Sequence, residues 1–171
     1  MSPITTIYLE MTDVAQLRPK ISADPHFRVL EATAKQWQFN RFLYEFIGAD
    51  WAWRDKLSWS DEQWHSYVED ERLQTFVAYY DGSVAGYFEL SVCDDEVEIA
   101  YFGLAPSFVG KGSGGAFLTR ALEEAWRTKP KRVWVHTCTL DHPFALKNYE
   151  DRGMVVYKTE TIQAAHVAAS L

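Results

Sequence analysis

The sequence has few cysteines, no long apolar run and no cluster of basic residues, and each shortage excludes a class of protein. Cys93 and Cys138 are the only cysteines in 171 residues. Two are too few for the disulfide framework of a small secreted fold or for a zinc-finger pattern. The five histidines lack the H-x-x-x-H spacing of a helical metal site, so we expect no metal. No apolar stretch approaches the roughly 20 residues of a membrane span.

The charge balance argues against a nucleic-acid partner. Acidic residues number 24 against 17 basic ones, which gives a net charge of −7. Nucleic-acid binding depends on neutralising phosphates, and the densest basic cluster is only Lys129, Lys131 and Arg132. The net charge is compatible with a cationic substrate. The first residues lack a basic region followed by an apolar core, so we expect a cytoplasmic protein.

The length and patterning predict one domain spanning residues 1–171, because repeats, linkers and low-complexity stretches are absent. Aromatic residues make up 15% of the chain and include seven tryptophans. Such large rings build cores and also line pockets. Five of the tryptophans lie close together in the sequence, at Trp37, Trp51, Trp53, Trp59 and Trp64.

Hydrophobic periodicity predicts alternating strands and helices. Strands are expected over residues 4–10, 27–32, 75–80, 84–92, 97–104, 132–140 and 154–159. Helices are expected over residues 36–47, 60–73 and 144–152, with another whose apolar face runs from Phe117 to Trp126. The segment Ser60–Gln63 has the pattern of a capping box, and Asp81-Gly82 that of a tight hairpin turn. The antiparallel strands followed by a strand–helix–strand crossover predict a mixed sheet with helices on its faces.

A glycine-rich loop precedes the third amphipathic helix. Residues 110–115 contain four glycines. Glycines before a helix N-terminus let an anion approach unpaired N–H groups, so the loop is a candidate phosphate cradle. It is not a P-loop, because Lys111 is followed by Gly112. A dinucleotide site is disfavoured too, since no acidic residue follows at the required distance.

Two segments together resemble a known family. The strand and turn over residues 97–106, the glycine loop and the following helix resemble motif A of the GNAT acyltransferase superfamily, with Gly112 and Gly114 at its two small positions. The pattern Ala145-x-x-x-Tyr149-x-x-x-Gly153-Met154 resembles motif B. The resemblance covers roughly residues 75–158.

The chain departs from the family pattern at four points. Val109 stands where the family has Arg or Gln, His142 where it has Asn, and Met154 where it has Phe. The strand that often closes the family's sheet is not evident after residue 160. Because the family's contacts with CoA in the glycine loop are largely through backbone N–H groups, we expect cofactor binding to survive the Val109 replacement.

The resemblance implies an α/β fold of the α+β type, a mixed and mostly antiparallel sheet of about six or seven strands with about four helices. It implies an N-acetyltransferase that moves an acetyl group from acetyl-CoA to a primary amine by direct attack in a ternary complex. Glu98 is then the candidate base and Tyr149 the acid that protonates the leaving thiolate. An oxyanion donor is expected near residues 102–104, where Gly103 fits a local bulge.

The same resemblance assigns the binding residues. The acceptor is expected to be a small-molecule or peptide amine, held by Trp51 and Trp53 through cation–π contacts. Both tryptophans, like Glu98 and Tyr149, also have a purely structural interpretation. A non-catalytic acyl-CoA-binding sensor stays open as an alternative function. A homodimer stays open as the oligomeric state. The residues expected to bind CoA are Phe102, Leu104, Val109, Gly110, Lys111, Gly112, Ser113, Gly114 and Gly115.

Overall fold

A computed structural model describes residues 3–51 and 53–163. The helices are α1 (Trp37–Gly48), α2 (Asp61–Glu69), α3 (Gly114–Arg127) and α4 (Ala145–Asp151), with short 3-10 turns at Val14–Gln16 and Pro106–Phe108. The strands are β1 (Ile4–Met11), β2 (Phe27–Glu31), β3 (Leu73–Tyr80), β4 (Ser83–Cys93), β5 (Glu96–Leu104), β6 (Arg132–Cys138) and β7 (Val155–Ile162).

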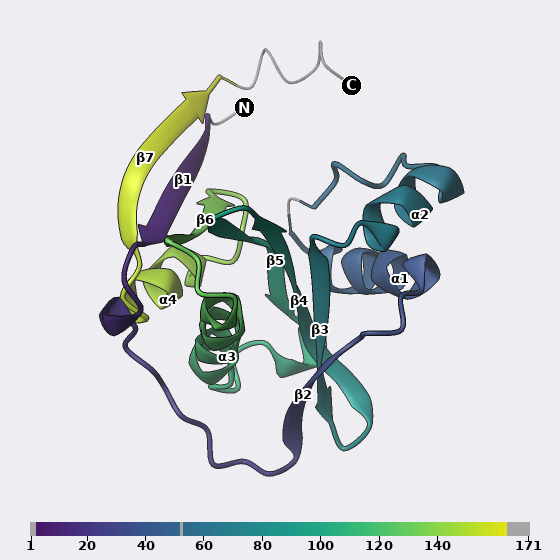
Figure 1. Cartoon of the computed structure of the whole chain (residues 1–171), viewed down its shortest axis with the longest axis horizontal. Coiled ribbons are helices and arrows are strands. Elements are labelled where there is room, and N and C mark those ends of the chain that lie inside the picture. Colours follow the sequence, from purple (N-terminus) through teal and green to yellow (C-terminus); the bar gives the residue numbers. More distant parts are fainter. Residues whose placement is uncertain (1–2, 52, 164–171) are drawn as a thin grey trace.

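The strands form one seven-stranded sheet in the order β2-β3-β4-β5-β6-β1-β7 (Figure 1). Every neighbouring pair is antiparallel except β5 and β6, which are parallel because α3 crosses over between them. The α/β fold class expected from the sequence, with a mostly antiparallel sheet and four helices, is confirmed.

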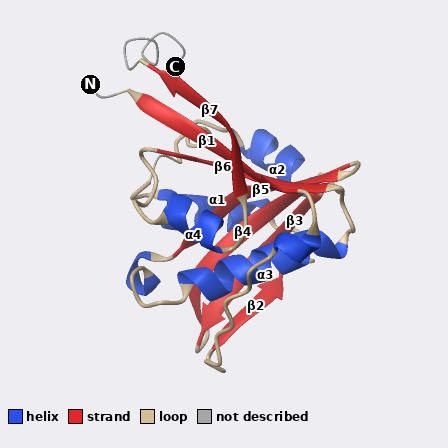
Figure 2. Ribbon diagram, turned by 90° about the vertical axis from the view of Figure 1, so that its left-hand side faces the viewer, coloured by secondary structure: helices blue, strands red, loops and turns tan. Residues whose placement is uncertain are grey.

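The helices cover the sheet on two faces. On one face, Phe117, Leu118 and Leu122 of α3 pack with Tyr149 of α4 in the larger core cluster. On the other, α1 and α2 contribute Leu43, Ile47, Trp64 and Val68 to a second cluster. Figure 1 shows α1 and α2 together on one side of the central strands, and α3 and α4 on the other. Figure 2 shows β1 and β7 extending beyond the rest of the sheet.

Local sequence signals are realised where they were expected. The Ser60 side chain accepts a hydrogen bond from the backbone N–H of Gln63, and the Gln63 side chain accepts one from the Ser60 N–H. Asp81 and Gly82 have φ of 48° and 89°, as their turn between β3 and β4 requires. The helix expected to reach residue 73 is shorter, because α2 ends at Glu69 and Leu73 starts β3 opposite Ser91.

The end of the chain differs most from expectation. The last strand runs to Ile162, so the prediction that it ends at residue 159 and that no strand is evident beyond 160 was wrong. It pairs antiparallel with β1, with Ile4 opposite Ile162. All eight of its residues are exposed, so no buried face imposes the alternation that sequence reading depends on. The tail beyond residue 163 lies outside the described residues.

Candidate active site

The site begins where two parallel strands separate. Pairing between β5 and β6 joins residues 96–98 to 132–134 and then stops, although both strands continue. Along its other edge, β5 stays paired with β4. Glu89 pairs with Tyr101 and Leu90 with Ile99, so Ala100 is an extra residue on β5 without a partner on β4. The bulge expected at Gly103 is therefore at Ala100. Such a bulge bends its strand, and here it lies where β5 turns away from β6.

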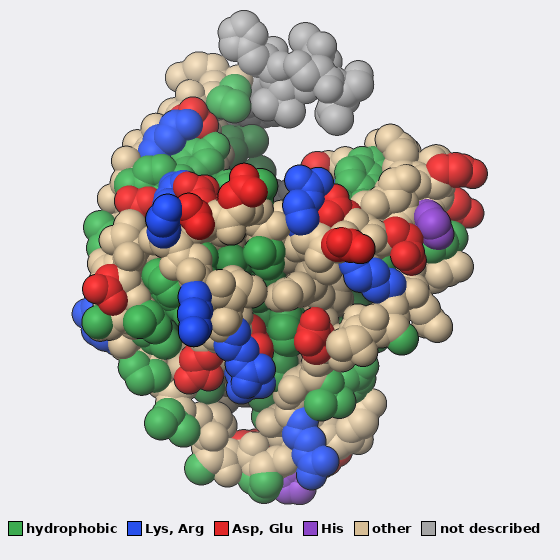
Figure 3. All heavy atoms as spheres, in the orientation of Figure 1, with side chains coloured by type: hydrophobic (Ala, Val, Ile, Leu, Met, Phe, Trp, Pro, Cys, Tyr) green, Lys and Arg blue, Asp and Glu red, His purple; other side chains and the backbone are tan. Residues whose placement is uncertain are grey.

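A cavity of about 980 Å³ opens at this gap. Its walls come from β1, β5, β6, α4, the glycine loop and the segment between α1 and α2. Figure 3 shows a deep notch between the arm of β1 and β7 and the part of the molecule that α1 and α2 form. Tyr8 and Arg54 line the cavity from these two sides. In the part of the chain that the structure describes, no helix combines the length and apolar character needed to cross a membrane.

The glycine loop forms the end of the cavity at the start of α3. Gly110 and Gly112 have φ of +77° and +86°, and an added Cβ at either would meet no atom within 4 Å. Of the nine residues predicted to bind CoA, Lys111 and Ser113 do not line the cavity. The Lys111 ammonium lies 5.6 Å from the Phe108 ring centre instead. The other seven predicted residues line it, which makes an open, backbone-rich cradle.

Two cations that sequence reasoning missed flank this cradle. Lys20 and Arg152 both line the cavity, and a Cβ on Gly115 would touch both side chains. The Arg152 Nε is buried without a hydrogen-bond partner among the described residues. Such an atom is costly unless a ligand or water satisfies it, so the position suits an anion. Lys20 lies in the coil before β2, far from any recognisable motif, and only the fold brings it here.

Tyr149 lies on the same face of the sheet as the glycine loop. Its side chain is only 6% exposed, and it lines the cavity. The ring centre lies 6.3 Å from that of Phe102 on β5. Burial raises the pKa of Tyr149, so the phenol is protonated at neutral pH. The neighbouring Asn148 donates a hydrogen bond of 3.2 Å to the Gly114 carbonyl, which ties α4 to the start of α3.

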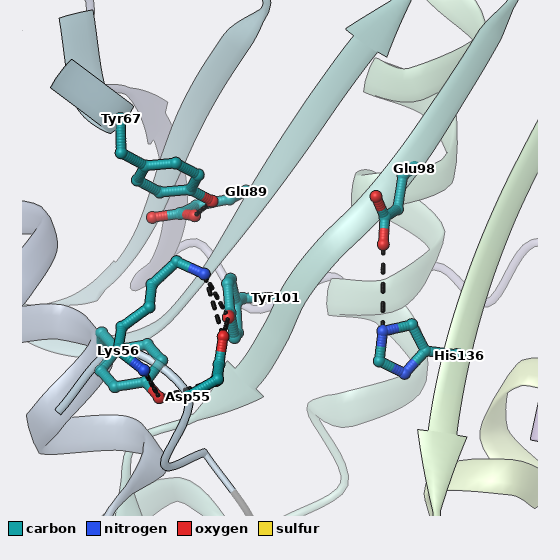
Figure 4. A network of polar contacts seen from close by, with 8 residues as sticks. Asp55, Lys56, Tyr67, Glu89, Glu98, Tyr101 and His136 are labelled. Carbon is teal, nitrogen blue, oxygen red and sulfur yellow. Dashed lines mark hydrogen bonds and ion pairs between the residues drawn. The ribbon is translucent and has the colours of Figure 1, made fainter. Parts of the chain in front are cut away.

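The opposite face carries a polar network around Tyr101 (Figure 4). The Tyr101 hydroxyl donates to Asp55 at 2.5 Å and accepts from the Lys56 ammonium at 2.7 Å. Tyr44 also donates to Asp55, at 2.9 Å. Burial acts to raise the pKa of Asp55, but the hydrogen bonds from Tyr101 and Lys56 outweigh it and lower the pKa. The network fixes the segment after α1 against β5.

Lys56 is a buried cation that fills an aromatic cage. Its ammonium lies 4.5 Å from the Trp59 ring centre and 4.8 Å from those of Tyr67 and Tyr101. Nearby, the fully buried Glu89 accepts hydrogen bonds from Tyr67 at 2.6 Å and Asn40 at 2.9 Å. Burial raises the pKa of Glu89, and these two donors oppose that effect. The cage is therefore occupied by a residue of the chain itself.

The two predicted acceptor tryptophans differ in their surroundings. Both line the cavity. Trp53 packs against Tyr44, Tyr87 and Tyr101, with ring centres 5.0–5.9 Å apart, and an added Cβ on Gly103 would press on it. Trp51 instead meets His142 edge to face at 5.1 Å. Trp53 thus lines the cavity with its ring packed against core residues, whereas Trp51 contacts the loop before α4.

Glu98, the predicted base, is the last residue of β5 that pairs with β6, and it is not among the residues that line the cavity. Its side chain is 27% exposed, and its Oε1 lies 3.9 Å from Nε2 of His136 (Figure 4). Burial raises the pKa of Glu98, and the charge of His136 opposes the shift. His136 does line the cavity. Sequence reasoning missed it, although its place after buried Val133 and Val135 puts it on the opposite face.

Comparison with protein families decides the classification. The family model described as the acetyltransferase (GNAT) family matches residues 30–154. This chain belongs to the GNAT acetyltransferase family. The match covers both motifs on which the sequence resemblance rested. A search of curated protein sequences finds no match.

Solved structures share the GNAT fold. A GCN5-related N-acetyltransferase from Sphaerobacter thermophilus superposes with a TM-score of 0.70 and 17% identity, over 92% of this chain and 50% of that one. An aminoglycoside acetyltransferase from an uncultured soil metagenomic sample gives 0.63 and 15%, over 83% and 100%. A tandem GNAT protein from the clavulanic acid pathway gives 0.57 and 15%, over 93% and 51%. The chain thus spans about half the length of two of these GNAT proteins.

Within residues 3–51 and 53–163, no three His, Cys, Asp or Glu side chains gather in a way that could hold a metal ion. The residues that meet at the gap are instead a phenol, an imidazole, carboxylates and backbone groups. These groups hold and transfer protons, and the glycine cradle suits a phosphate.

Proposed function

We propose that this GNAT domain transfers an acetyl group from acetyl-CoA to a primary amine by direct attack in a ternary complex. The observation that carries the proposal is a single cavity that passes through the gap between β5 and β6. It joins the glycine cradle and Tyr149 on one face to the polar network on the other. A donor entering from the first face and an acceptor from the second would meet at the gap.

The CoA end is assigned to the glycine loop and the start of α3. Backbone N–H groups at a helix N-terminus favour an anion, and the glycines leave room for the pyrophosphate. Lys20 and Arg152 add positive charge beside it. Beyond Glu98, the edge of β5 toward β6 has no strand paired with it among the described residues. The backbone along that edge is therefore free to pair with the pantetheine arm and to stabilise the oxyanion.

The transfer itself requires two proton movements. The neutral amine nitrogen bonds to the thioester carbonyl carbon, the carbon–sulfur bond breaks, and the sulfur leaves with the bonding electrons. The nitrogen's proton passes to a base, for which the sequence offered Glu98, either directly or through water. The sulfur receives a proton from Tyr149, whose raised pKa keeps the phenol protonated until the thiolate forms. No metal takes part in this proposal.

The acceptor is proposed to be a cationic small molecule or peptide amine. Asp55 lines the cavity, and its lowered pKa keeps it ionised at neutral pH. It pairs with the Lys56 ammonium at 3.0 Å, but its side chain is 58% exposed and can meet a second cation. Trp51 and Trp53 form the adjacent wall. One solved neighbour is an aminoglycoside acetyltransferase, which is consistent with a polycationic acceptor for this chain. A cytoplasmic location belongs to the same proposal and rests on the two scattered cysteines of the sequence.

A panel of amines with acetyl-CoA tests this function. The panel should include aminoglycosides, polyamines, amino acids and peptides, and the readout is released CoA thiol together with the mass of the acetylated product. We expect turnover that depends on at least one cationic amine. CoA binding without turnover on any amine would contradict an enzyme and favour an acyl-CoA sensor.

A further inference from the structure

His136 stands beside the open part of the gap. Pairing between β5 and β6 ends at Glu98 and Trp134, and His136 is two residues further along β6. Because Val135 is buried on the α3 face, His136 projects from the opposite one, where Tyr101 and Asp55 lie. It lines the cavity, whereas Glu98 does not. Of these two residues, the imidazole is the one placed to meet a molecule inside the cavity.

The His136 ring is held from two sides. Tyr8 is its direct partner across β1 and β6, with the two ring centres 5.7 Å apart. Glu98 lies 3.9 Å from Nε2, which is too long for a hydrogen bond but close enough for an ion pair once the ring is protonated. Figure 4 shows the second ring nitrogen, Nδ1, turned away from Glu98. The carboxylate therefore favours the tautomer with its proton on Nε2 and leaves Nδ1 free to accept one.

We propose that His136, and not Glu98, takes the proton from the acceptor amine, with Glu98 as a positioning residue behind it. The inference rests on the proposed acetyl transfer. As the nitrogen–carbon bond forms and the carbon–sulfur bond breaks, the proton on the attacking nitrogen moves to Nδ1 of His136. The imidazolium is stabilised by the Glu98 carboxylate, and the ring later releases the proton to solvent.

The chemistry favours the imidazole for this role. A base works best when its pKa lies near the working pH, and imidazole is the side chain whose ordinary range is nearest neutrality. Burial raises the pKa of Glu98, but the charge of His136 opposes that shift. The groups that face His136 are Glu98 from β5 and Tyr8 from β1. The Tyr8 hydroxyl donates to Glu160, and the Lys158 ammonium lies over its ring, so β7 adds one charge of each sign nearby. Glu98 is thus the nearest charge to the ring.

Base and acid then lie on opposite faces of the sheet. Tyr149 belongs to the core cluster on the α3 face, and His136 projects from the face that carries Tyr101. The amine would lose its proton on one side of the gap, while the sulfur gains one on the other.

Four variants test the assignment with the most active amine of the panel. His136→Gln should lower kcat about 10²-fold and remove the acidic limb of the pH–rate profile. Glu98→Gln should lower kcat by about tenfold, because the imidazolium formed in the reaction loses the carboxylate 3.9 Å from it. His65→Gln, on the exposed surface of α2, and Glu96→Gln, whose carboxylate pairs with Arg132 at 3.1 Å, are matched controls that should retain full activity.

Two further readouts separate a proton acceptor from a packing residue. Added imidazole should restore part of the turnover of His136→Gly, and CoA affinity measured by calorimetry should stay unchanged in all variants. The carboxyl ¹³C shift of Glu98 should titrate at higher pH in His136→Gln, because the charge that lowers its pKa is gone.

The outcomes distinguish this inference from the proposed function. If His136→Gln keeps kcat within about threefold while Glu98→Gln loses about 10²-fold, Glu98 acts directly and the inference is overturned with the acetyltransferase intact. Failure of imidazole to rescue a stably folded His136→Gly would overturn it too. If the wild-type chain acetylates no amine, the proposed function itself fails.

Discussion

Replacing Tyr149 by phenylalanine isolates one oxygen atom of the site. The ring is 6% exposed and packs in the α3-side core, so Phe keeps its apolar contacts. Removing a hydroxyl changes the free energy of unfolding by about 1 kcal/mol or less when the ring stays in place. If the hydroxyl protonates the leaving thiolate, its loss should lower kcat about 10²-fold, equivalent to roughly 2.7 kcal/mol of activation free energy.

The assay combines three measurements on the same preparation. Thiol release gives kcat, calorimetry gives the Kd for CoA, and thermal unfolding gives Tm. We expect a large fall in kcat, an unchanged Kd and a Tm within a few degrees of wild type. Tyr87→Phe is a matched control, because that buried hydroxyl has no hydrogen-bond partner in the described part of the chain. Unchanged turnover in Tyr149→Phe would reduce this residue to a packing role and refute the reasoning.

The remaining predictions concern the acceptor wall and its network. Trp53→Ala should raise the acceptor KM about 2- to 30-fold through lost cation–π contact. It should also lower the unfolding free energy by about 2–4 kcal/mol, because the ring braces Tyr44 and Tyr101; a stability loss with unchanged acceptor kinetics would make Trp53 purely structural. Asp55→Asn should cost about 1 kcal/mol at pH 7, since the side chain is 58% exposed. Because folding lowers the Asp55 pKa, this contribution is present above the unfolded value near 3.9 and lost as pH falls through the folded one. Denaturant curves at pH 7 and pH 3 should therefore show a difference from wild type that shrinks in acid, and a constant difference would contradict the assignment.

The features that could be read from the sequence are local ones. The capping box at Ser60, the turn at Asp81 and Gly82, and the glycine loop each depend on neighbouring residues alone. The two family motifs add the order of the elements and the position of Tyr149. For this reason the fold class was predictable, and so was a glycine loop before a helix, which the structure places at one end of the cavity.

The features that were missed depend on pairing between distant segments. The separation of β5 from β6 follows from a parallel register and a bulge at Ala100, neither of which leaves a local pattern. His136 lines the cavity that opens at this separation, whereas Arg152 lines it because the end of α4 lies beside Gly115 at the start of α3. The sequence analysis assigned no role to Lys56, yet Lys56 is only 8% exposed because three aromatic faces surround it.

The central claim is that the glycine cradle and the gap between β5 and β6 form a CoA-thioester site. Calorimetric titration of CoA into wild type, Gly112→Asp and Gly112→Asn tests it most directly. Both variants strain the positive φ of this position, although Asn and Asp are among the side chains that adopt it most often, and only Asp adds a negative charge where the phosphates should lie. We predict measurable CoA binding by wild type, and a loss of affinity for Gly112→Asp at least tenfold greater than for Gly112→Asn, or about 1.4 kcal/mol. Absence of binding to wild type at millimolar CoA, or equal affinity in the two variants, would contradict the account.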